Sequence, residues 1–271
     1  MNRFSINEMT TYRWTFEEDV LHYAAAGVRA VGVWRHKLSD FGEERGIELI
    51  ADSGLKVSSL LWAGGFTGSE GTTHRESIVD AKETIRLAAA LHASCLVLYT
   101  GARAGHTHNH ARRLMRSALK ELRPIAEEHG VTLAIEPMHP GCNGDWTFLT
   151  DVDETLELID SAESPYVKIC FDTYHLAQDE SIFGRLEELA SRIALVQLGD
   201  AKEPPQGEQD RCCLGEGVIP LSRLVSSLEA AGYRGYYELE LMGEEIEAAD
   251  YGEVLERSKR VYSEIVSAAG V

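Results

Sequence analysis

The strongest constraint on the fold is a regular alternation of short β-rich runs and longer helical patterns along the whole chain. Runs of apolar, β-branched and aromatic residues predict eight strands, near 3–7, 30–34, 56–61, 94–99, 131–136, 167–172, 193–198 and 235–241. A helical pattern follows each run, near 16–26, 42–53, 76–92, 110–129, 151–161, 180–190, 220–231 and 252–268. Glycines just past several predicted helix ends, as in DSGL at 52–55, mark the usual stop before the next strand.

Strands that are joined by helices run parallel, and eight such units favour closure into a (β/α)8 barrel. A doubly wound open sheet is the alternative, but such sheets usually have fewer strands, and no glycine-rich dinucleotide fingerprint follows the first predicted strand. The length of 271 residues suits one barrel of about 250 residues. We therefore predict an α/β protein with a single TIM barrel domain over residues 1–271.

The charge balance argues against one class of partner. The chain has 44 acidic and 26 basic residues, which gives a formal net charge of −18 at pH 7. Such a chain would repel a phosphate backbone, so we expect no nucleic acid partner. The five cysteines show no C-x-x-C spacing, and no run is apolar enough to span a membrane. We expect a cytoplasmic protein without a targeting segment or membrane contact; whether it forms a homo-oligomer stays open.

Side chains with hard oxygen donors stand at the predicted carboxyl ends of the last four strands. They are Glu136, Asp172, Gln197, Glu238 and Glu240. In a barrel these strand ends meet at one mouth, where the chemistry of such folds takes place. Carboxylates crowded there without a cation would repel one another, so the pattern predicts a site for a divalent metal such as Mn²⁺ or Mg²⁺. The alternative is that each acid only caps a helix or pairs with a loop arginine.

Glu238 and His175 lie near the predicted ligands, and we consider their roles separately. Glu238 and Glu240 face the same side of their strand because side chains alternate along it. Glu240 is nearer the rim, so we predict it as the ligand, with Glu238 one layer deeper or behind the ligands. His175, three residues beyond Asp172, is expected to bond a substrate hydroxyl or carbonyl, or else to be a solvated loop histidine.

Other residues are candidates for contacts with a substrate. His139 lies in the stiff segment EPMHPG at 136–141. Trp34 and Trp62 end the second and third predicted strands, where they could form an apolar wall for a sugar ring or simply pack in the core. His108, with His106 and His110, follows the fourth strand and could contact substrate, add a metal site or do neither. The polar segment 200–211 is a candidate active-site lid.

Five motifs resemble those of the sugar phosphate isomerase/epimerase family of xylose isomerase-like barrels. They are LAIEP at 133–137, FDTYH at 171–175, VQLGD at 196–200, RCCLGEGVIP at 211–220 and GYRGYYELE at 232–240. The likeness is close over the last four strands and covers the first half only in layout. It implies one divalent metal, usually Mn²⁺, Mg²⁺, Co²⁺ or Zn²⁺, held by a glutamate, an aspartate, a histidine and a second glutamate.

The family pattern assigns these ligands by position to Glu136, Asp172, residue 197 and Glu240, and it implies a substrate contact for His175. Arg211, the first residue of the motif at 211–220, is a further candidate for a substrate contact. The chain departs from the pattern at Gln197, where histidine is usual. An amide oxygen still binds a hard cation, so we expect the metal to be retained, with Mn²⁺ or Mg²⁺ favoured over Zn²⁺.

A second departure from the family pattern concerns the substrate. Ketose epimerases of the family have a substrate-holding glutamate six residues after the first ligand, and here that position is Cys142. This residue argues against simple ketohexose epimerisation.

The ligand set predicts the chemistry. A metal that binds two neighbouring substrate oxygens makes the adjacent C–H acidic, and Glu136 or Glu240 can remove that proton. We therefore predict a metal-dependent isomerase or epimerase of a sugar or sugar-derived ketone, acting through a metal-held ene-diolate. A lyase or dehydratase acting on a keto-sugar or inosose, including cleavage of 3-keto-glycosides, shares the first step and stays an alternative.

Two further alternatives come from other classes of protein. A non-catalytic sugar-binding barrel is compatible with Gln197 and Cys142. An endonuclease acting at abasic sites shares the barrel, but the net charge of −18 and Gln197 argue against it. A phosphate on the substrate is not implied, because no glycine-rich basic cradle follows the last two strands.

Overall fold

The computed structural model describes residues 3–269, and within this range eight strands form one closed barrel in chain order. The strands are β1 (Phe4–Asn7), β2 (Ala30–Trp34), β3 (Lys56–Ala63), β4 (Cys95–Leu98), β5 (Thr132–Ile135), β6 (Val167–Asp172), β7 (Ile193–Leu198) and β8 (Tyr237–Leu239). All neighbouring pairs are parallel, and the pairing of β8 with β1 closes the ring. The predicted (β/α)8 barrel is confirmed.

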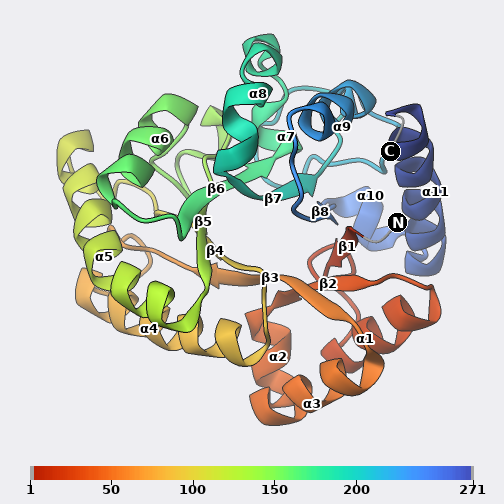
Figure 1. Ribbon diagram of the computed structural model, residues 1–271, viewed down its shortest axis with the longest axis horizontal. Helices are drawn as coiled ribbons and strands as arrows, with labels where there is room; N and C mark the ends of the chain where they lie inside the picture. Colours follow the sequence, from red (N-terminus) through yellow and green to blue (C-terminus); the bar gives the residue numbers. More distant parts are fainter. Residues whose placement is uncertain (1–2, 270–271) are drawn as a thin grey trace.

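Helices form the outer ring around the strands (Figure 1). The α-helices are α1 (Phe16–Ala25), α2 (Arg35–Phe41), α3 (Glu43–Ser53), α4 (His74–Ala90), α5 (His108–His129), α6 (Val152–Ser161), α7 (Thr173–Leu176), α8 (Leu186–Leu189), α9 (Leu221–Ala230), α10 (Glu244–Ala248) and α11 (Tyr251–Ala268). Capping boxes at Thr15 and Thr73 begin α1 and α4, and left-handed glycines end α3 and α5.

One predicted helix is wrong in its form. The segment 180–190 is not a continuous helix but the 3₁₀ turn η2 (Glu180–Gly184) followed by α8 and the 3₁₀ turn η3 (Ala190–Arg192). Gly184 lies in the middle of this segment, where glycine disfavours a helix. Two 3₁₀ turns and the short helix α8 between them therefore replace the predicted continuous helix. A third one, η1 (Pro140–Cys142), lies in the loop after β5.

The barrel interior is filled by a layer of apolar side chains directly beneath the mouth. This inner cluster consists of Leu61, Cys95, Val97, Ala134, Cys170 and Leu195. Ala134, Cys170 and Leu195 each precede a predicted metal ligand by two residues, so they face the same way one layer down. The interior is thus a packed core, and the polar side chains above it are held at the carboxyl ends of the strands.

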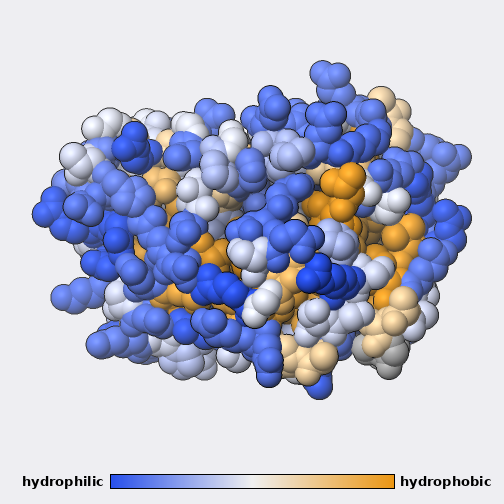
Figure 2. Space-filling view, turned by 90° about the horizontal axis from the view of Figure 1, so that it is seen from above, coloured by the Kyte–Doolittle hydropathy of each residue, from blue (hydrophilic) through white to orange (hydrophobic). Residues whose placement is uncertain are grey.

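The interior also holds a buried acid opposite β2. A Cβ atom at Gly32 would come within 2.6 Å of the carboxylate of Glu238, so only glycine leaves room for this side chain. The side of the molecule shown in Figure 2 is largely hydrophilic, with apolar side chains visible between polar ones. Among residues 3–269, no helix has the length and apolar character needed to cross a membrane.

Candidate active site

The predicted metal ligands come from four consecutive strands. Glu136 directly follows β5, Asp172 ends β6, Gln197 lies in β7 and Glu240 directly follows β8. Asp172 is paired in register with Gln197. All four side chains are buried, with at most 3% of any of them exposed. The fold therefore places these oxygen donors at one end of the barrel.

His175, at the third position of α7, lies between two of these acids. Its Nε2 is 3.8 Å from both Glu136 Oε1 and Asp172 Oδ2. The backbone N–H of His139 donates to His175 Nδ1 at 3.2 Å, so in the neutral ring the proton resides on Nε2. Nε2 makes no well-aligned hydrogen bond among the described residues, although Glu208 Oε2 lies 3.3 Å away. This nitrogen is therefore a donor that faces three carboxylates, which suits a bond to a substrate oxygen better than metal ligation.

Arg211 brings a fixed positive charge into the same space. Its Nη1 donates to Asp172 Oδ2 at 2.7 Å and lies 3.8 Å from Glu240 Oε2. The guanidinium also lies 4.4 Å from the ring centroid of Tyr174. Burial alone would lower the pKa of Arg211, but Asp172 and Glu240 raise it above the usual arginine value. Arg211 thus links the acid of β6 to the acid after β8.

The acids of the site favour a bound cation. Burial raises the pKa of Glu136 well above its usual value, and Glu240 and Asp172 raise it further. Burial likewise raises the pKa of Glu240. Buried carboxylates that lie close together repel one another when they are charged. They therefore either take up protons or bind a cation.

Gln197 can complete a ligand set. Its Oε1 accepts a weak hydrogen bond from Cys170 Sγ at 3.0 Å, and its buried Nε2 is without a partner in the described part of the chain. A half-turn about the last side-chain bond exchanges the amide oxygen and nitrogen. Three carboxylates and one amide then offer only oxygen donors, the ligands that Mn²⁺ and Mg²⁺ prefer. The residues present therefore fit a hard divalent ion.

Glu238 lies deeper than the ligand layer. It accepts hydrogen bonds from Ser58 Oγ at 2.6 Å, Ser59 Oγ at 2.8 Å and Asn7 Nδ2 at 3.0 Å. The same Asn7 nitrogen is 3.3 Å from Glu240 Oε1. Asn7, which ends β1, was not singled out from the sequence, and it connects the deep acid to the acid at the rim.

The predicted lid contributes a residue that sequence reasoning missed. Glu208, in the segment 200–211, places Oε2 at 3.3 Å from His175 Nε2 and 3.2 Å from Arg211 Nη2. It also lies beside Cys142, whose Sγ is within 4.8 Å of the Glu208 carboxylate. Burial alone would raise the pKa of Glu208, but His175 and Arg211 lower it to about 2.

Glu208 lies beside the position of the departure at Cys142. The resemblance implies a substrate-holding glutamate at this position in ketose epimerases, and here a carboxylate from the lid lies against the cysteine instead. The Tyr174 hydroxyl donates to the backbone oxygen of Gly207 and holds the lid there. The polar character of 200–211 pointed to a lid, but no sequence signal indicated which of its acids turns inward.

The histidines after β4 do not converge on a metal. His108 begins α5, and its Nε2 lies 2.5 Å from Glu154 Oε1 of α6. His110 is two residues further along the same helix, and such residues do not share a face. His106 Nε2 lies 3.1 Å from the backbone oxygen of Thr67. The structure therefore does not bring His108 to the candidate site. Trp34 and Trp62 line a cavity at the carboxyl ends of β2 and β3, and His139 orients His175 through its backbone.

Comparisons with known proteins agree with this architecture. A family model described as xylose isomerase-like TIM barrel matches residues 20–261. An inosose isomerase of Halalkalibacterium halodurans is 27% identical over 156 residues, which cover 56% of this chain and 54% of the relative. An L-ribulose-5-phosphate 3-epimerase of Escherichia coli O157:H7 is 28% identical over 141 residues, covering 52% of this chain and 46% of the relative. The chain thus spans about half the length of the curated relatives it matches.

A solved structure is similar over nearly the whole chain. It is a protein from Sinorhizobium meliloti 1021 with a TM-score of 0.89 and 27% sequence identity, covering 97% of this chain and 98% of that one.

Proposed function

The chain belongs to the xylose isomerase-like TIM barrel family, and from this premise we propose that it is a metal-dependent isomerase or epimerase of a sugar or sugar-derived ketone. The observation that carries the proposal is the set of buried oxygen donors at the mouth, Glu136, Asp172, Gln197 and Glu240, with the pKa of both glutamates raised by burial. The curated relatives, an inosose isomerase and a ribulose-phosphate epimerase, support the reaction class.

These four residues would hold the ion. Because their donors are all oxygen, we propose Mn²⁺ or Mg²⁺, with Co²⁺ or Zn²⁺ as alternatives. When bound, the ion would supply Lewis-acid polarisation of the substrate carbonyl, which acidifies the neighbouring C–H.

The two glutamates are the proposed acid and base. Glu136 follows β5 and Glu240 follows β8, so they approach the mouth from strands that are not adjacent in the barrel. One carboxylate removes the proton next to the carbonyl and the other returns it, which is what epimerisation requires. A raised carboxyl pKa suits both steps, because a base with a pKa near the working pH also serves as an acid.

The remaining polar groups bind and orient the substrate. Arg211, positively charged beside Asp172, stabilises negative charge that develops on a substrate oxygen. The Nε2–H of His175, which makes no well-aligned hydrogen bond within the described residues, donates to a substrate hydroxyl or carbonyl. Glu208 accepts from a second hydroxyl and, being part of the lid, excludes water once the substrate is bound.

A direct test is proton exchange. The protein is incubated with Mn²⁺ and a panel of ketoses, inososes and 3-keto-glycosides in D₂O, and loss of the C–H signal next to each carbonyl is followed by NMR. We expect exchange and a new isomer or epimer with at least one substrate, and none after chelation of the metal. No exchange with any of them, although Mn²⁺ binds, would favour the non-catalytic sugar-binding barrel.

A lyase or dehydratase on a keto-sugar or inosose is the second candidate. The observation in its favour is Cys142, which stands where the ketose epimerases of the family have a substrate-holding glutamate. The same NMR assay distinguishes it, because expulsion of a β-hydroxyl or β-linked group gives an enone and a released fragment in place of an isomer.

A further inference from the structure

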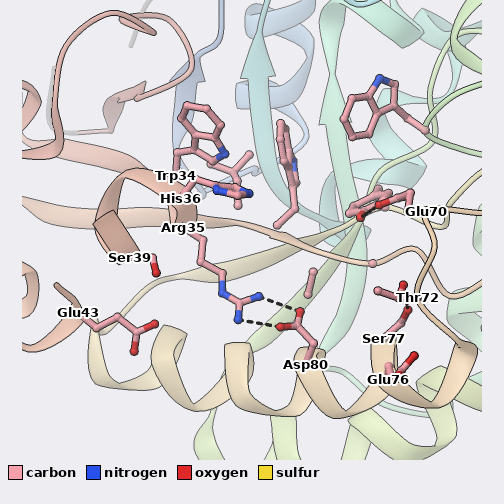
Figure 3. Close-up of a pocket in the computed structure, with 16 residues that line it drawn as sticks. Trp34, Arg35, His36, Ser39, Glu43, Glu70, Thr72, Glu76, Ser77 and Asp80 are labelled. Carbon is pink, nitrogen blue, oxygen red and sulfur yellow. Dashed lines mark hydrogen bonds and ion pairs between the residues drawn. The ribbon is translucent and has the colours of Figure 1, made fainter. Parts of the chain in front are cut away.

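A large cavity opens at the carboxyl ends of β2 and β3, the end of the barrel that also carries the candidate active site (Figure 3). It has a volume of about 700 Å³ and is lined by residues from the carboxyl ends of β2 and β3, from α2 and from α4. Small-molecule sites of about 300–1,000 Å³ enclose ligands of drug size. A single sugar ring bound at the acids would leave this space to water.

Aromatic rings form the walls of the cavity. Trp34, Trp62 and Trp146 line it together with Tyr99, so three of the four tryptophans of the chain gather here. The ring centroids of Trp62 and Trp146 are 6.0 Å apart, and Tyr99 meets Trp146 edge to face at 5.9 Å. Trp146 is 39% exposed. Exposed aromatic faces of this kind suit a ligand that has an apolar C–H face, as a pyranose ring does.

The polar lining of the cavity favours hydroxyl groups over phosphate. Glu43, Glu70, Glu76 and Asp80 contribute carboxylates to it. The guanidinium of Arg35 is bonded through both Nη atoms to Asp80 at 2.8 Å, as the dashed lines in Figure 3 show, so its charge is already compensated. In Glu70 and Glu76 one oxygen already accepts a hydrogen bond within the protein. The carboxylate oxygens that are left accept hydrogen bonds from hydroxyls and repel an anionic group.

Trp62 connects the cavity to the proposed metal centre. Its ring packs on the inner cluster, which includes Ala134 and Cys170. These two residues lie one layer beneath Glu136 and Asp172 on the same faces of β5 and β6. Its Nε1 is buried and finds no partner within residues 3–269, so it can still donate a hydrogen bond. Trp62 thus belongs both to the lining of the cavity and to the packing around the layer beneath the proposed ligands.

We propose that this cavity is a subsite for a second, uncharged sugar ring, so that the substrate is a keto-glycoside of two rings and not a free or phosphorylated monosaccharide. This inference rests on the proposed function and narrows its substrate class. The ring attached through the glycosidic bond stacks on Trp62 and Trp146, and its hydroxyls donate to carboxylates such as Glu70.

The test uses tryptophan fluorescence, because most tryptophans of the chain line the cavity. The Mg²⁺-loaded protein is titrated with maltose, cellobiose and trehalose, and with glucose and glucose 6-phosphate for comparison. We expect at least one disaccharide to bind about tenfold or more tightly than glucose, which corresponds to about 1.4 kcal/mol, and glucose 6-phosphate to bind no better than glucose.

Two variants test whether the disaccharide binds in this cavity. Trp146→Ala removes a partly exposed ring and is expected to weaken disaccharide binding about tenfold while leaving glucose binding unchanged. Trp14→Phe is the matched control, because Trp14 stacks on His22 of α1 outside the cavity, and it should keep the wild-type affinities. The subsite is overturned if no disaccharide binds better than glucose, if glucose 6-phosphate binds best, or if Trp146→Ala keeps full disaccharide affinity.

The outcome separates this inference from the proposed function. Exchange of C–H protons in free ketoses without a disaccharide preference would leave the isomerase proposal intact and remove the subsite. Disaccharide binding that depends on Trp146, without proton exchange in any keto-sugar or keto-glycoside, would support the subsite and contradict the isomerase proposal.

Discussion

Arg211 and Asp172 form a buried ion pair at the centre of the barrel mouth, with Nη1 and Oδ2 2.7 Å apart. The other oxygen of Asp172, Oδ1, accepts the backbone N–H of Tyr174 at 2.8 Å. A carboxylate has about four lone-pair sites on its two oxygens, so Asp172 can hold these two donors and still bind a cation. The pair orients the aspartate and keeps a positive charge beside the position proposed for the metal.

We predict that Asp172→Asn weakens Mn²⁺ binding by at least about tenfold to a hundredfold, because the variant loses a charged ligand and turns an N–H₂ group toward Arg211. Isothermal titration calorimetry measures this change. Glu238→Gln is the matched control, since Glu238 is an equally buried acid bound by Ser58 and Ser59 one layer deeper, and its affinity should stay near that of the wild type. Equal losses in both variants would contradict the proposed ligand set.

Substitution of the two proposed bases tests the reaction. Glu136→Gln and Glu240→Gln keep an oxygen for the metal but cannot take up a proton, so turnover should fall by roughly 10² to 10⁴ while Mn²⁺ affinity falls only modestly. Rates of C–H exchange in D₂O and calorimetric metal titration measure the two effects.

The activities of the two variants, Glu136→Gln and Glu240→Gln, distinguish an isomerase or epimerase from a lyase. In an isomerase or epimerase both variants lose product formation. A lyase needs one glutamate for the C–H step, so the other variant would still exchange the substrate proton. Full activity in both would leave these carboxylates as metal holders only.

The barrel and the placement of four oxygen donors at its mouth were predictable because both follow from local patterns. Alternating strands and helices require parallel pairing, and an acid at an inward-facing position of a strand end faces the mouth. Glu208 was not predictable, because the direction of a lid side chain depends on His175 and Arg211, which are distant in sequence. The substrate contact predicted for His108 could not be judged from the sequence. The histidine-rich spacing does not reveal that a helix begins at His108 or that the His108 ring faces Glu154.

The lid glutamate gives a prediction on substrate binding. Glu208→Ala should raise KM by roughly ten- to a hundredfold, since a charged hydrogen bond to the substrate contributes about 1.5–3 kcal/mol and each 1.4 kcal/mol is about a factor of ten, with a smaller change in kcat. Adding Cys142→Glu returns a carboxylate to the same space and should restore part of the lost affinity. Steady-state kinetics of the single and double variants measure this recovery. A double variant no better than Glu208→Ala would show that the carboxylate does not act from this position.

A second group of buried charges lies outside the proposed site and affects stability. Lys37 Nζ donates to Asp19 Oδ2 at 2.6 Å and to the backbone oxygens of Glu8 and Thr11. Glu8 accepts the backbone N–H of Trp34, while its Oε1 has no partner in the described residues. Burial raises the pKa of Asp19 to about 7 and the pKa of Glu8 well above its usual value. One lysine therefore faces two buried acids.

The sign of the pH effect follows from the raised pKa of Asp19. An unfolded aspartate has a pKa of about 3.9, so between about pH 4 and pH 7 the folded chain binds a proton that the unfolded chain releases. The free energy of unfolding must then fall as the pH rises through this window, by at most about 1.4 kcal/mol per pH unit for one proton. Above about pH 7 this contribution is constant.

We predict that Asp19→Asn removes this part of the pH dependence of the free energy of unfolding, because asparagine does not titrate. Above about pH 7 the variant is also less stable than the wild type, because it lacks the ion pair with Lys37. Urea unfolding at several values between pH 4.5 and 7.5 gives the slope for each variant. Other buried acids such as Glu238 add their own dependence, so the quantity to compare is the difference from the wild type. Asp40→Asn, an exposed position of α2, is the control and should keep the wild-type slope. An unchanged slope in Asp19→Asn would mean that Lys37 keeps Asp19 ionised throughout this range, so that the ion pair outweighs the burial of the acid.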